Sequence, residues 1–154
     1  ESTLNDSMVF EEVRELLVNS FSLAPNVLFL QFDELDAAGH NYGFSSEVSG
    51  YANTLFKIDV FVESLFNIIE EKRNDLGENW LFLIVSDHGG DGTGHGDAEN
   101  PHINQTIFFS QHPELNFIPN YTTNQADLAP TILDYMGVVS EEIDCKMDGV
   151  SIIE

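Results

Sequence analysis

Residues 80–90 read WLFLIVSDHGG, six apolar residues that run directly into a polar, glycine-rich turn. A continuous apolar run bounded by turn residues predicts a strand buried on both faces, as strands of parallel sheets are. Residues 27–32, VLFLQF, form a second such run. Between the two, apolar residues recur at three- and four-residue steps from Val48 to Ile69, which predicts an amphipathic helix ending before Gly77. Strand, helix and strand in this order predict an α/β fold, with a mostly parallel sheet flanked by helices.

Three further elements complete the expected fold. Apolar spacing predicts a helix over residues 8–21, a short strand over residues 106–109, and a helix over residues 127–136 that is closed by Gly137. Pro130 fits the last helix only if it lies in the first turn, where backbone amides have no intrahelical partner. The sequence has no repeat and no linker of low complexity, and 154 residues suit a single compact domain.

The charge of the chain excludes some partners. Its 27 acidic residues face 5 Lys and Arg, for a net charge of −22, so we expect no nucleic-acid-binding surface. The single cysteine, Cys145, excludes an internal disulfide framework and a cysteine zinc cluster. No apolar run reaches the roughly 18–20 residues of a membrane span, so we expect no transmembrane segment. Three Asn-x-Ser/Thr sequons, which begin at residues 5, 104 and 120, lean towards a secreted, periplasmic or secretory-lumenal location without establishing it.

Candidate metal ligands follow both long apolar runs. Asp36 and His40 come after the first run in an expected loop, Asp87 and His88 directly follow the second, and His95 lies seven residues beyond them. Ligands gather beyond the carboxyl ends of parallel strands, so we expect these side chains to meet. Two carboxylates and three imidazoles exceed the needs of one four-coordinate zinc ion. They predict two divalent cations about 3.5–4 Å apart, an arrangement that suits phosphoryl transfer, and the imidazoles favour Zn²⁺ over Mn²⁺.

Other assignments stay open at this point. Asp33 could replace Asp36, and His102 could replace His95, although the spacing favours Asp36 and the flanking glycines favour His95. His112, before Pro113, is expected at the surface. Five of the eight residues from 89 to 96 are glycine, so this loop is expected to be flexible unless something, such as a metal ion on His95, holds it. An α/β domain without any metal is a further alternative.

Short motifs resemble those of the alkaline phosphatase superfamily. Residues 36–40, DAAGH, resemble the Asp-x-x-Gly-His motif of nucleotide pyrophosphatases, phosphodiesterases and ethanolamine-phosphate transferases. Residues 86–89, SDHG, are similar to the superfamily's Ser/Ala-Asp-His-Gly motif, and residues 94–96, GHG, to a Gly-x-His-Gly element shortened by one residue. Residues 127–133, DLAPTIL, and 148–151, DGVS, resemble two later motifs in the same order.

This resemblance implies an alkaline-phosphatase-like core, of which residues 1–154 form the C-terminal part of a single catalytic domain. Asp36, His40 and His95 would then hold one zinc ion, while Asp87 and His88 would contribute to the second. The family's Thr or Ser nucleophile belongs to an N-terminal half, so we expect no catalytic nucleophile in this chain and no activity from it in isolation. A first residue of Glu1 rather than Met agrees with a fragment or a processed product.

The function implied is a two-metal-dependent hydrolase of phosphate esters, with a small-molecule substrate. A phosphodiesterase or nucleotide pyrophosphatase fits the motifs best. A phosphomonoesterase, a phosphoglycerate-mutase-like enzyme, a sulfatase or an ethanolamine-phosphate transferase would use the same scaffold. A non-catalytic metal-binding module is the alternative from a different class, because the nucleophile is missing.

Overall fold

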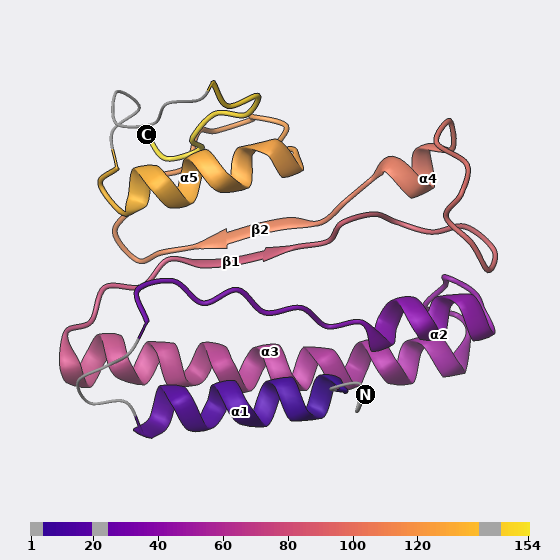
Figure 1. The fold of residues 1–154 in the computed structure, drawn as a ribbon, viewed down its shortest axis with the longest axis horizontal. Coiled ribbons are helices and arrows are strands. Elements are labelled where there is room, and N and C mark those ends of the chain that lie inside the picture. Colours follow the sequence, from indigo (N-terminus) through magenta and orange to yellow (C-terminus); the bar gives the residue numbers. More distant parts are fainter. Residues whose placement is uncertain (1–4, 20–24, 139–145) are drawn as a thin grey trace. The chain divides into compact units, whose positions relative to one another are not determined.

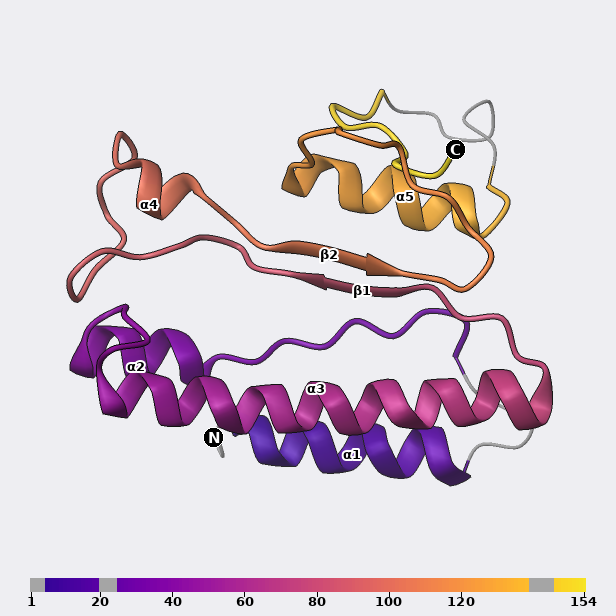
Figure 2. The same ribbon diagram turned by 180° about the vertical axis from the view of Figure 1, so that it is seen from behind.

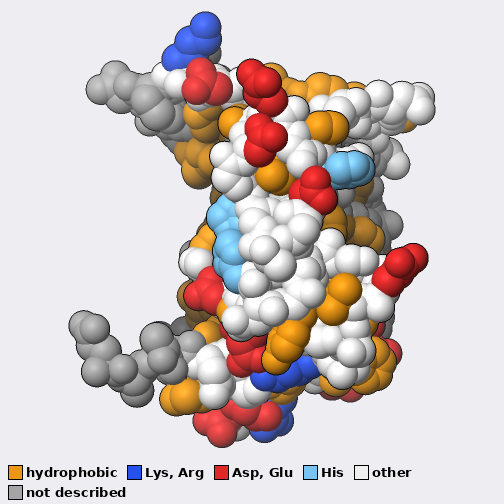
Figure 3. All heavy atoms as spheres, turned by 90° about the vertical axis from the view of Figure 1, so that its right-hand side faces the viewer, with side chains coloured by type: hydrophobic (Ala, Val, Ile, Leu, Met, Phe, Trp, Pro, Cys, Tyr) orange, Lys and Arg blue, Asp and Glu red, His pale blue; other side chains and the backbone are white. Residues whose placement is uncertain are grey.

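The computed structural model describes residues 5–19, 25–138 and 146–154, and it divides into two units. The first unit comprises residues 1–79 and 90–98, and the second comprises residues 80–89 and 99–154. None of the helices in the described ranges is both long and apolar enough to cross a membrane. Acidic side chains are spread over the face that Figure 3 shows, as the charge of the sequence leads one to expect.

Three helices build the first unit: α1 (Asp6–Asn19), α2 (Glu34–Tyr42) and α3 (Ser49–Leu76). Helix α1 lies along α3, and α2 packs near the beginning of α3 (Figure 1). The side chains that α1 buries, Phe10, Val13 and Leu17, follow helical spacing, and Phe10 stacks on Phe61 of α3 with ring centroids 4.4 Å apart. The helices predicted over residues 8–21 and 48–69 are confirmed by α1 and α3, although residues 20 and 21 lie outside the described ranges.

The end of α3 matches the predicted stop. Gly77 caps the helix with a left-handed φ of 67°, and its N–H donates to the carbonyl of Lys72. Glycine adopts this conformation without the steric cost that a Cβ imposes.

The prediction of a strand over residues 27–32 is wrong. The segment has the alternation of an extended chain, with Val27 and Phe29 exposed and Leu28 and Leu30 half-buried, but it pairs with no described residue as a strand. Phe32 instead lies 6.1 Å from the ring of Phe61 on α3. An apolar sequence favours an extended conformation, but a strand exists only where a partner takes up its backbone hydrogen bonds.

The second unit carries a two-stranded sheet. Strands β1 (Phe82–Val85) and β2 (Phe108–Gln111) pair antiparallel, with Phe82 opposite Gln111 (Figure 2). The expected mostly parallel sheet is therefore not found among the described residues. A parallel pair needs a crossover, usually through a helix, whereas the connection between β1 and β2 holds only the four-residue helix α4 (Pro101–Asn104). Helices with a small antiparallel sheet remain compatible with part of an α/β fold.

The last predicted helix is confirmed. A 3₁₀ turn, η1 (Gln125–Asp127), leads into α5 (Leu128–Tyr135), and Pro130 lies in the first turn of α5 as required. Asp127 and Thr131 are fully buried. They accept hydrogen bonds from the amides of Val150 (3.0 Å) and Ile152 (3.2 Å), which fixes the C-terminal segment against α5.

Candidate metal centre

Helix α2 carries the first two candidate ligands. Asp36 and His40 were expected in a loop, but they lie one helical turn apart on α2. The helix brings the two side chains together, because residues four apart on a helix project from the same face. His40 Nε2 lies 3.5 Å from Asp36 Oδ2.

The beginning of α2 is held by a side chain of another helix, a contact that the sequence does not predict. Asp6 of α1 is buried, and its carboxylate accepts hydrogen bonds from the amides of Asp33 (2.9 Å) and Glu34 (3.0 Å). A negative charge on the first amides of a helix stabilises it. Only the fold reveals this pairing, because 27 residues separate Asp6 from Asp33 along the chain.

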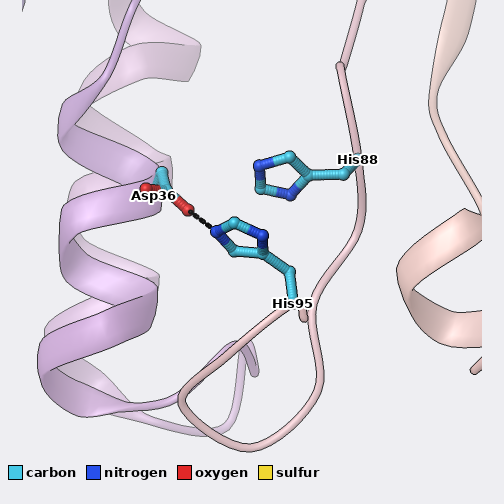
Figure 4. A group of neighbouring side chains, drawn as sticks. All are labelled: Asp36, His88 and His95. Carbon is cyan, nitrogen blue, oxygen red and sulfur yellow. Dashed lines mark ion pairs between the residues drawn. The ribbon is translucent and has the colours of Figure 1, made fainter. Parts of the chain in front are cut away.

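His95 joins Asp36 and His40 from the glycine-rich loop. Its Nε2 lies 3.0 Å from His40 Nε2 and 3.5 Å from Asp36 Oδ1. Figure 4 shows Asp36 and His95 directed towards each other, with their ion pair as a dashed line. Two nitrogens that share one tetrahedral zinc ion at about 2.0–2.1 Å lie about 3.3 Å apart, close to the separation observed here.

The tautomer of the neutral His40 ring follows from its second contact. Its Nδ1 lies 2.9 Å from the carbonyl oxygen of Thr93, which can only accept, so Nδ1 carries the hydrogen. In the neutral ring the lone pair is then on Nε2, the atom that faces Asp36 and His95. A backbone carbonyl on the outer ring nitrogen is the usual support of a metal-binding histidine. One carboxylate and two imidazoles form a donor set that fits zinc.

A phenol stands beside this group. Tyr51 lies in the first turn of α3, and burial, with a smaller effect from the negative charge of Asp36, raises its pKa above the usual 10.0. The hydroxyl therefore stays protonated at neutral pH. The sequence placed Tyr51 only on the apolar face of a helix.

Asp87 and His88 belong to the second unit, directly after β1. The His88 amide donates to Asp87 Oδ1 (3.0 Å), and His88 Nδ1 lies 2.8 Å from the carbonyl of Gly89. That carbonyl can only accept, so the hydrogen of the neutral ring lies on Nδ1 and the lone pair on Nε2, as for His40. The Gly89 amide donates to Ile103 at 2.7 Å, which ties the turn to α4.

Gln125 supports the same turn from η1. Its Nε2 donates to the carbonyls of Ser86 (2.9 Å) and Asp87. Residues of this unit also line a pocket of about 240 Å³ beside the two candidate ligands. Besides Asp87 and His88, the lining consists of one apolar and four uncharged polar side chains: Ile103, Asn104, Thr106, Asn124 and Gln125.

The other candidates have different surroundings. Asp33 Oδ1 accepts a hydrogen bond from Gln31 Nε2, and His102 is exposed on α4 in the second unit. His112 was expected at the surface, but it is buried. Its Nδ1 accepts from the amides of Glu114 and Leu115, both at 3.1 Å, so it closes the turn after β2.

Comparison with known proteins agrees with the motifs. The chain is 29% identical to a 2,3-bisphosphoglycerate-independent phosphoglycerate mutase of Malacoplasma penetrans, over 84% of this chain and 24% of the relative. It is 26% identical to a phosphopentomutase of Helicobacter pylori, over 82% of this chain and 29% of the relative. By their names, both relatives are mutases. No solved structure matches the chain.

The family itself follows from a longer match. The family described as type I phosphodiesterase / nucleotide pyrophosphatase matches residues 3–140, and the chain belongs to it. The resemblance predicted from the motifs is thereby confirmed. The chain spans about a quarter of the length of the two relatives.

Proposed function

We propose that this chain is the metal-binding part of an enzyme that hydrolyses phosphodiester or pyrophosphate bonds with the help of two zinc ions. The observation that carries the proposal is the convergence of Asp36, His40 and His95, with His40 oriented by the carbonyl of Thr93, in a chain of this family. These three side chains would hold one ion. Asp87 and His88 would contribute to the second.

Bound divalent cations would stabilise the negative charge that develops on phosphate oxygens during phosphoryl transfer. They would also offset the repulsion that a chain of net charge −22 exerts on an anionic substrate. The hydrogen bonds on His40 Nδ1 and His88 Nδ1 keep each ring in the tautomer with a lone pair on Nε2. The pocket beside Asp87 and His88 offers uncharged polar groups to the esterified part of the substrate.

The attacking hydroxyl is proposed to belong to the longer protein, outside these 154 residues. The two relatives are roughly three and a half to four times as long as the segment of each that matches this chain. Activity is accordingly expected of the full-length protein rather than of this chain alone.

A mutase is the second candidate, because both relatives are named as mutases. Such an enzyme would return the phosphoryl group to the hydroxyl of a phosphorylated metabolite instead of passing it to water. The metal ligands would be the same, and only the acceptor would differ.

The full-length protein can be tested against nitrophenyl esters of a phosphodiester, a phosphomonoester and a sulfate, with and without zinc, beside a His95→Ala variant. Zinc-dependent cleavage of the diester that is lost in the variant supports the proposal. Isomerisation of a phosphosugar or phosphoglycerate without net hydrolysis would favour the mutase. Zinc binding without turnover of any of these compounds would leave a binding module as the better account.

A further inference from the structure

The ring of Phe44 is enclosed by two glycines that come from different segments. A methyl group added to Gly39 of α2 would lie 2.3 Å from a ring carbon of Phe44, and one added to Gly90 would also lie 2.3 Å from the ring. Both distances are far below van der Waals contact. The ring therefore occupies the space of the missing side chains, against α2 on one side and against the glycine-rich loop on the other.

The same ring meets both imidazoles of the candidate metal centre. Its centroid lies 5.5 Å from that of His40 and 6.1 Å from that of His95, with interplanar angles of 81° and 86°. Edge-to-face contacts of this kind favour particular ring orientations. Tyr51 lies on the ring as well, at 5.9 Å. Phe44 thus restrains the rotation of the two histidines that are proposed to share an ion.

Backbone contacts fix the loop at the same place. The Phe44 amide donates to the carbonyl of Gly92 (2.8 Å), and the next residue, Thr93, accepts from His40 Nδ1. Within the loop, Asp91 and Gly94 exchange two hydrogen bonds, at 3.0 and 3.1 Å. All of these contacts join groups of the chain itself, and together they favour one conformation of the loop despite its glycines.

We infer that Phe44 is a positioning residue: it holds residues 90–96 against α2 and orients His40 and His95 before any metal ion binds. The role of His40 and His95 as metal ligands rests on the proposed function, but the ordering of residues 90–96 by Phe44 does not. A site that is ordered in advance binds its ion without the entropic cost of ordering a flexible glycine-rich segment.

The test measures two quantities on the 154-residue chain: amide hydrogen exchange of residues 90–96 in metal-free protein, and zinc affinity by competition with a chromophoric chelator. In Phe44→Ala we expect faster exchange in the loop and an affinity about 10–100-fold weaker, the usual effect of losing a residue that orients a ligand. Phe29→Ala is the matched control, because Phe29 is 77% exposed in the same unit, and it should change neither quantity.

Gly90→Ala provides an independent variant, because its methyl group would displace the ring of Phe44. It should reproduce both effects alone and add little to them in Phe44→Ala, where the space is vacant. Protected amides in α3 show that each variant is folded. If the α3 amides of Phe44→Ala are not protected, that variant is unfolded, and loop exchange and zinc affinity are then compared between Gly90→Ala and the wild type.

Unchanged loop exchange in the folded variants would overturn the inference, and so would an unchanged zinc affinity. If the wild-type chain binds no zinc while Phe44→Ala still loosens the loop, the proposed metal function fails and the role of Phe44 in the loop stands. The two proposals can therefore fail separately.

Discussion

Gly39→Ala should destabilise the chain, even though alanine is a better helix former than glycine. Gly39 is buried in α2, between the candidate ligands Asp36 and His40. The added methyl group would meet three ring carbons of Phe44, at 2.3, 2.4 and 2.5 Å. The ring has little room to withdraw, because Gly90 and the rings of the nearby residues enclose it from the other sides.

Two opposing effects set the magnitude. Replacing glycine by alanine inside a helix stabilises it by about 1 kcal/mol. Overpacking a filled site costs about 1–3 kcal/mol. The net change in the free energy of unfolding is therefore a loss of about 0–2 kcal/mol. With Phe44→Ala in the background the clash is absent, and Gly39→Ala should instead stabilise the chain by about 1 kcal/mol.

Urea unfolding of the four proteins of this double-mutant cycle measures the effect, in the presence of a chelator so that bound zinc cannot mask it. The expected coupling free energy between the two positions is about 1–3 kcal/mol. If Gly39→Ala stabilises the wild type as much as it stabilises Phe44→Ala, Phe44 does not fill the space beside Gly39, and the packing described here is wrong.

Three further predictions concern side chains outside the set of candidate ligands. Gln125→Glu replaces an amide donor by a carboxylate that repels the carbonyl oxygens of Ser86 and Asp87. Urea unfolding should show a free energy of unfolding that is lower by about 1 kcal/mol. An unchanged free energy would show that Gln125 does not stabilise the turn after β1. The hydroxyl of Tyr121 donates to Asp127 Oδ1 (3.4 Å), and desolvation first and Asp127 second raise the pKa of Tyr121 above the usual 10.0. The contribution of Tyr121 to stability is therefore present below about pH 10 and is lost as the pH rises through the folded-state pKa. Tyr121→Phe should make stability fall less steeply above about pH 10, and an unchanged profile would contradict this. Asp6→Asn removes a buried negative charge from the first amides of α2; a destabilisation of about 1–3 kcal/mol is expected, and a neutral result would show that α2 needs no such cap.

The helices could be predicted from the sequence because their apolar spacing is long and regular. Val48 to Ile69 keep the same alternation throughout, and Gly77 stops the helix for a reason visible in a single residue. Pro130 likewise fits only one place in a helix, and α5 places it there. In these cases local rules and the tertiary structure agree.

The strands were harder to predict, because an apolar run does not say which partner it will find. Residues 27–32 and 80–85 look alike in sequence, yet only the second run supplies a described strand. The pairing of β1 with β2 joins residues that are separated by a long connection. Nothing local to either segment indicates that the two strands are antiparallel.

The candidate ligands could be chosen from the sequence, but what supports them could not. Spacing favoured Asp36 over Asp33, and the structure brings Asp36 to His40 and His95. The prediction of a loop around Asp36 is wrong. It depends on a strand over residues 27–32, after which a loop would follow, and that strand does not form. The ring of Phe44 packs against Gly90, which is nearly 50 positions later in the chain. Such long-range contacts leave no periodic signal in a single sequence.

Zinc binding to the metal-free chain, measured by equilibrium dialysis and metal analysis, tests most directly whether Asp36, His40 and His95 are ligands of one ion. His40→Ala, His95→Ala and Asp36→Asn are each expected to bind less zinc than the wild type, because each loses a ligand of the same ion, whereas Asp33→Asn and His102→Ala should retain the wild-type zinc content. Equal zinc contents in all five variants, or loss only in the last two, would contradict the assignment of this centre.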